Sequence, residues 1–179
     1  MPHIHTEPGQ HDQTASAFVI RTDTPEPRIL LHMHKKLGVL MEPGGHVELN
    51  ETPWQAVLHE VLEESGYMVE QLQVLQPVLR LKSLAGAVLH PVPVVLNTHK
   101  VDVAGNHKHS DIEFAFIVQT NPAQGPAEGE SRDLRWLSLA ELNDLSQDEI
   151  FSDVREVCQF VLTDILPNWE TVPATEFAR

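Results

Sequence analysis

The chain has 179 residues, 41% of them hydrophobic, which suits one folded domain with a sizeable core. Asp and Glu number 26 against 12 Lys and Arg, so the formal net charge is -14. This balance argues against sequence-independent binding to nucleic acid, which needs a basic surface, but allows an anionic small ligand held through metal ions. There is no basic and apolar leader and no apolar run long enough to span a bilayer. We therefore expect a cytoplasmic protein with no membrane partner.

The order of the predicted elements indicates one domain with a mixture of strands and helices. We expect a flexible tail over residues 1–13, a domain over 14–166 and a second tail over 167–179. Apolar, β-branched runs predict strands over 15–22, 28–33, 74–83, 90–101, 111–120 and 134–139. Periodic or capped segments predict helices over 53–65, 140–145 and 152–165. These elements predict an α+β fold, built as an α/β/α sandwich.

The helix predicted over 53–65 has clear signals at both ends. Thr52 suits the N-cap, Pro53 the first helical position, and Gln55 completes a capping box. Gly66 suits the left-handed residue that ends a helix. The apolar residues recur at helical spacing and predict the buried face, which comprises Trp54, Val57, Leu58, Val61 and Leu62.

A second face of this helix carries Glu60, Glu63 and Glu64. Acids spaced by three and four residues repel one another and destabilise a helix by a few tenths of a kcal/mol per pair, so a divalent cation is a natural compensation. The alternative is an ordinary solvated acidic face.

The residues around this helix resemble the Nudix box. In that motif a Gly is followed, after five residues, by a Glu and, after seven more, by Arg-Glu-hydrophobic-any-Glu-Glu-any-Gly-hydrophobic. Here Gly45 and Glu51 have the required spacing, and residues 59–67 read HEVLEESGY. Only His59, in the place of the Arg, departs from the motif.

The resemblance implies a Nudix domain with a mixed sheet and hydrolysis of a diphosphate linked to another group, usually a nucleoside. It implies Mg²⁺, with Mn²⁺ as an alternative, held by Glu60, Glu63, Glu64 and the carbonyl of Gly44. Glu51 would orient the helix carboxylates, as residues behind metal ligands do. A further acid from the loop before Trp136 would be a ligand or general base. Glu130 is the candidate and Glu128 the next choice.

Groups that could contact a phosphate are few. Lys35 and Lys36 precede the glycine turn, and Arg80 and Lys82 would share one face of a strand; each pair could equally be a solvated surface pair. We expect a nucleotide-type substrate, which could be a nucleotide, a nucleotide sugar or a dinucleotide, and a monomer or homodimer.

Three alternatives remain open in the sequence. His59 favours a non-catalytic, nucleotide-binding or regulatory Nudix protein; in an active enzyme it would pair with Glu51 in acid. The isomerase branch of the fold needs a catalytic cysteine, but Cys158 falls on an apolar helix stripe and is expected in the core. For zinc, His32 with His34, or His107 with His109, would share a strand face, but the spacing fixes no third ligand.

Overall fold

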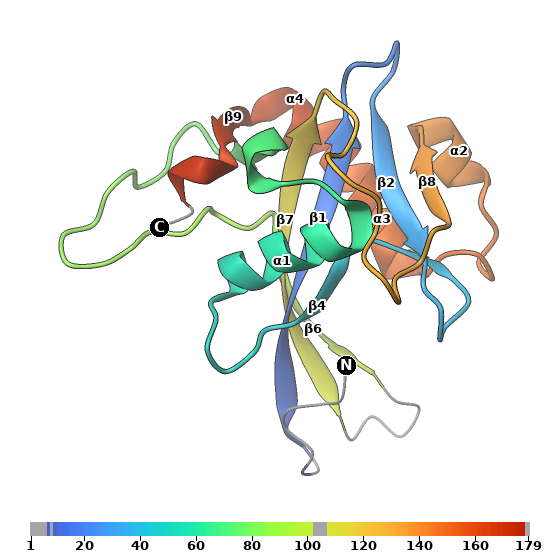
Figure 1. Ribbon diagram of the computed structural model, residues 1–179, viewed down its shortest axis with the longest axis horizontal. Helices are drawn as coiled ribbons and strands as arrows, with labels where there is room; N and C mark the ends of the chain where they lie inside the picture. Colours follow the sequence, from blue (N-terminus) through green and yellow to red (C-terminus); the bar gives the residue numbers. More distant parts are fainter. Residues whose placement is uncertain (1–6, 8, 102–106, 178–179) are drawn as a thin grey trace.

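A twisted mixed sheet forms the centre of the computed structural model, which describes residues 7, 9–101 and 107–177 (Figure 1). The strands are β1 His11–Arg21, β2 Arg28–Met33, β3 Leu40–Met41, β4 Gly44–His46, β5 Gln73–Gln76, β6 Val95–Lys100, β7 Lys108–Val118, β8 Leu134–Leu137 and β9 Glu170–Pro173. The helices are α1 Pro53–Ser65, α2 Leu139–Asp144, α3 Ser152–Phe160 and α4 Leu166–Asn168, with a wide turn over Val161–Ile165 and short 3₁₀ turns over Val69–Gln71 and Ala174–Glu176.

The two longest strands, β1 and β7, lie side by side and run parallel, from His11 opposite Lys108 to Arg21 opposite Val118. The other strand pairs are antiparallel, and the main path through the sheet is β3-β2-β1-β7-β5-β9. In addition, β4 pairs with β1, β6 with β7 and β8 with β2. The expected α+β fold with a mixed sheet is confirmed.

Alternation along β1 divides the core between the two faces of the sheet. Ala15, Ala17 and Val19 pack with Trp54, Val57 and Val61 of α1. Phe18 and Ile20 pack on the other face with Val154 and Cys158 of α3. Cys158 is fully buried in this second core, as its helical stripe predicted.

Helix α1 has the bounds that its sequence predicts. The Thr52 side chain accepts a hydrogen bond from the Gln55 N–H, and the Gln55 side chain accepts one from the Thr52 N–H. Gly66 ends the helix with φ 79°, in the left-handed region. A Cβ at this position would also lie 1.9 Å from the Gln124 carbonyl oxygen, so the close approach of a loop requires glycine as well.

The strand predicted over 74–83 is wrong beyond Gln76. Pro77 has no N–H to give to a ladder, and residues 77–94 lie outside strands, with Leu79 95% exposed. In Figure 1 this segment extends away from the sheet. The short strands β3 and β4 lie between β2 and α1, where no strand was predicted. The helix predicted over 152–165 widens into a π turn after Phe160.

Regular structure extends beyond both ends of the domain predicted from the sequence. Strand β1 begins at His11, and β9 pairs with β5 over Glu170–Pro173, close to the carboxyl end. The division of the chain into tails and domain stays a prediction. Within the described ranges, no helix combines the length and apolarity needed to cross a membrane.

Candidate functional site

Two carboxylates of α1 lie against the glycine turn formed by Gly44 and Gly45. The exposed fractions of Glu60 and Glu64 are each 8%. The Gly44 N–H donates a hydrogen bond of 2.9 Å to Glu64 Oε2. A Cβ on Gly45 would lie 2.1 Å from Glu60 Oε1, so glycine is what allows this carboxylate to approach the turn. The pairing of β4 with β1 therefore positions the turn over the acidic face of α1.

Burial disfavours the charged form of these two carboxylates. It raises the pKa of Glu60 to about 7, with the charge of Glu63 as the next cause. Burial also raises the pKa of Glu64 to about 8; the Gly44 N–H opposes this change, and the charges of Glu60, Glu130 and Glu42 reinforce it. A divalent cation would relieve both desolvation and repulsion, and clustered carboxylates are the ligands that Mg²⁺ prefers.

Glu63 is more exposed and has its own partner. Its Oε1 lies 3.0 Å from Nε2 of His59, one helical turn earlier. Glu51 Oε1 instead accepts a hydrogen bond of 2.9 Å from the Glu48 N–H. The expected pair between His59 and Glu51 is therefore replaced by a pair within α1, at the i, i+4 spacing.

The loop over residues 121–131 is attached to the end of α1. The Ala127 N–H donates to the Glu63 carbonyl at 2.7 Å, and the Gln124 N–H to the Gly66 carbonyl at 3.4 Å. This attachment brings Glu130 close enough for its charge to raise the pKa of both Glu60 and Glu64. Glu128, the next choice from the sequence, is exposed.

The four basic residues considered for phosphate fall into two groups. Lys35 lies beside the same loop, where its ammonium donates to the Gly129 carbonyl, and Lys36 is exposed next to it. Arg80 and Lys82 lie outside any strand and both pair with Glu170. The sequence expectation that Arg80 and Lys82 share a strand face is thus wrong, and the structure gives both a carboxylate partner on β9.

His32 lies next to these carboxylates. From the sequence it was considered only as half of a possible zinc pair with His34. Its exposed fraction is 3%, and its Nδ1 lies 3.7 Å from Glu64 Oε1. Burial lowers the pKa of His32 to about 4, so the ring is neutral at physiological pH. The signal that could have found it is a polar residue within the apolar run of β2.

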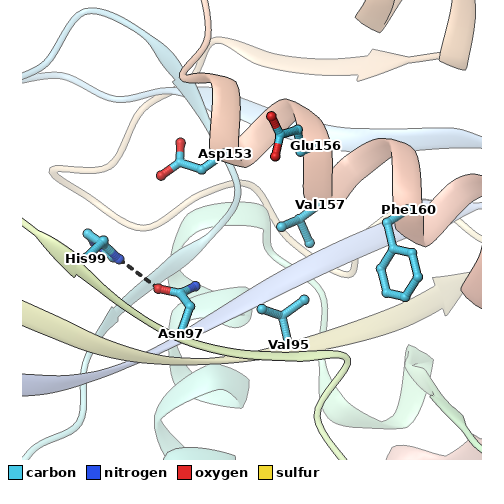
Figure 2. Close-up of a pocket in the computed structure, with 7 residues that line it drawn as sticks. All are labelled: Val95, Asn97, His99, Asp153, Glu156, Val157 and Phe160. Carbon is cyan, nitrogen blue, oxygen red and sulfur yellow. Dashed lines mark hydrogen bonds between the residues drawn. The ribbon is translucent and has the colours of Figure 1, made fainter.

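A separate hollow of about 420 Å³ opens on the other side of the sheet, between β6 and α3 (Figure 2). Asn97 and His99 line it from the strand, and Asp153, Glu156 and Phe160 from the helix. Its two helix carboxylates repel a phosphate, so it does not resemble a phosphate site.

Comparison with known proteins agrees with this geometry. The family model for the NUDIX domain matches residues 11–157. A MutT-like protein from Streptomyces ambofaciens is 38% identical over 69 residues, which are 38% of this chain and 43% of that protein, so the match spans less than half of the relative.

Solved structures share the fold over most of the chain. A NUDIX-family hydrolase from Clostridium perfringens is 26% identical, with a TM-score of 0.69, covering 84% of this chain and 95% of its own. An Ap4A hydrolase from C. elegans, solved as a binary complex, is 17% identical, with a TM-score of 0.59 and coverage of 83% and 93%. The NUDIX domain of Shewanella oneidensis NrtR, in complex with ADP ribose, is 15% identical, with a TM-score of 0.59 and coverage of 84% and 85%.

Proposed function

Because the chain belongs to the NUDIX family, we propose that it is a metal-dependent hydrolase that cleaves the diphosphate linkage of a nucleoside diphosphate derivative. The observation that carries this proposal is the pair of buried carboxylates, Glu60 and Glu64, held against the Gly44–Gly45 turn. Two such groups with raised pKa values are a stable arrangement when a cation lies between them.

The proposed ligands are Glu60, Glu63 and Glu64, with the Gly44 carbonyl, and the proposed ion is Mg²⁺ or Mn²⁺. The ion would supply positive charge to the phosphate oxygens as negative charge develops on the leaving group. The chain would hold Glu64 in place through the Gly44 N–H, with the neutral His32 ring nearby.

Glu130 is the proposed proton acceptor for the attacking water. It lies on the loop attached to α1, and its charge reaches both buried carboxylates. Lys35, which holds the same loop through Gly129, is the proposed cation for an outer phosphate. Glu51, hydrogen-bonded to the Glu48 backbone, would keep the start of α1 in register with the turn.

The proposed substrate class covers nucleotides, nucleotide sugars and dinucleotides. Ap4A and ADP ribose, the compounds with which two structural neighbours are named, fall within this class. The likeness of those two proteins to this chain is one of fold.

A panel of nucleoside triphosphates, nucleotide sugars and dinucleotides, assayed for phosphate release with Mg²⁺ or Mn²⁺, tests the proposal. We expect turnover of at least one compound. Glu64→Gln, which keeps the shape of the side chain but removes its charge, should lower the rate at least about 100-fold. An active Glu64→Gln variant would refute the ligand assignment.

One observation favours a second candidate, a nucleotide-binding regulatory protein without catalysis. His59 stands where the box has arginine, and its ring pairs with the carboxylate of Glu63, one of the proposed ligands. Tight binding of a panel compound without turnover, under conditions that saturate Mg²⁺, would select this alternative.

A further inference from the structure

A group of histidines surrounds a buried aspartate on the sheet face opposite to Glu60. This group, here named the His–Asp cluster, comprises Asp12 of β1, His46 of β4, His107 and His109. The parallel register sets Asp12 opposite His109, and the antiparallel register sets His46 opposite Thr14. Asp12 and Thr14 share the face of β1 that carries Phe18 and Ile20, so the cluster lies on the side of α3.

The side chains of the cluster lie close to one another. Asp12 Oδ2 lies 3.2 Å from His107 Nε2 and 3.4 Å from His46 Nε2. One ligand atom from each of Asp12, His107 and His109 lies within 4.8 Å of the others. The rings of His46 and His109 are 4.8 Å apart between centroids. His99 of β6, which lines the hollow of Figure 2, pairs across the strands with His109 of β7, and their ring centroids are 5.6 Å apart.

We propose that the His–Asp cluster binds a divalent transition cation of the zinc type. Imidazole nitrogens with one carboxylate oxygen are a ligand set typical of Zn²⁺, whereas Mg²⁺ prefers oxygen alone. Tetrahedral coordination at zinc–ligand distances near 2.0–2.2 Å brings ligand atoms to about 3.3–3.6 Å of one another. The Asp12–His46 distance falls within this range, and the Asp12–His107 distance lies just below it.

Burial of Asp12 adds an electrostatic reason. Its side chain is fully buried, and a carboxylate in that position needs positive charge or several donors. Zinc supplies that charge at any pH at which the imidazoles are neutral. Without metal, the His107 ring lies within hydrogen-bond distance of Asp12. The cluster can therefore form both with and without the ion.

The proposed ion site is separate from the carboxylates of α1. Gly45 contacts Glu60 on one face of the sheet, while His46, the next residue, points to the other face. Binding at the cluster can therefore be measured while Mg²⁺ saturates the carboxylates, and it does not depend on hydrolysis.

The test is a Zn²⁺ titration of the full chain, made without a polyhistidine tag, by calorimetry in excess Mg²⁺. We expect one Zn²⁺ per chain, with affinity reduced at least about tenfold in His107→Gln and in His109→Gln. His90→Gln is the matched control, since His90 is exposed in the segment outside the sheet. Co²⁺ in place of Zn²⁺ should give the strong visible absorption of a four-coordinate site.

Circular dichroism and the metal-free melting temperature identify variants that fold normally, and Asp12→Asn supplies an isosteric third test. The Glu60→Gln/Glu64→Gln double variant should keep the Zn²⁺ affinity of the native chain. Zn²⁺ binding that survives in both His107→Gln and His109→Gln would overturn the proposal. So would binding that is lost only in a His3→Gln/His5→Gln variant, because the sequence carries these histidines near its start.

Discussion

His59 Nε2 lies 3.0 Å from Glu63 Oε1, so the residue that departs from the box pairs with one of the proposed metal ligands. The exposed fractions of the two side chains are 56% and 45%, and such a pair contributes about 0.2–1 kcal/mol at most. Its importance therefore lies in competition, because the imidazole and a metal ion would contact the same carboxylate.

We expect His59→Gln to strengthen Mg²⁺ binding, because it removes the imidazole that pairs with Glu63. The free energy of unfolding should change by no more than about 0.5 kcal/mol, because the site is on the helix surface. Calorimetric Mg²⁺ titrations of the variant, with native protein alongside, measure the difference. Equal affinities of native protein and variant would show that the pair does not compete with the ion.

Glu130→Gln should lower the maximal rate at least about tenfold, because general base catalysis by a positioned side chain contributes about 100-fold or more. The melting temperature should stay close to native, since Glu130 lies in a loop. Glu128→Gln is the control, being two residues away and exposed. A rate loss confined to Glu128→Gln would transfer the role to that residue.

Gly45→Ala should disturb the site without unfolding the chain. The new Cβ would lie 2.1 Å from Glu60 Oε1, and the end of that flexible side chain is what must move. A displacement of about 1 Å in a catalytic group costs about 100-fold in rate, so we expect a loss of this size together with weaker Mg²⁺ binding. Gly125→Ala, where a Cβ meets nothing within 4 Å, is the control. Native turnover by Gly45→Ala would argue against Glu60 as a ligand.

Local signals explain which elements could be predicted from the sequence. The caps of α1 lie within a few residues of the helix they end, and its bounds were predicted correctly from Thr52, Pro53 and Gly66. The strand predicted over 74–83 failed because apolar composition does not reveal whether a neighbouring strand is present, and after Pro77 none pairs with it. The partner of His59 was mistaken although i, i+4 spacing alone indicates Glu63.

Long-range pairing explains what could not be predicted. The sequence supplied His107 and His109 but no third ligand, because Asp12 lies 95 residues from His107 and reaches it only through the parallel pairing of β1 with β7. The proximity of His32 to Glu64 likewise joins two residues 32 positions apart, one on β2 and one on α1.

The last prediction concerns protons at the carboxylates of α1. In the metal-free protein the pKa values of Glu60 and Glu64 are raised to about 7 and about 8, chiefly by burial. Below these values both groups are largely protonated, so an incoming cation must displace a proton from each. Mg²⁺ affinity should therefore rise as pH increases from 6 to about 8 and level off above, with proton release largest at the acidic end. Calorimetry in two buffers of different ionisation enthalpy counts the protons released. An affinity independent of pH over this range, with no protons released, would mean that the ion binds elsewhere.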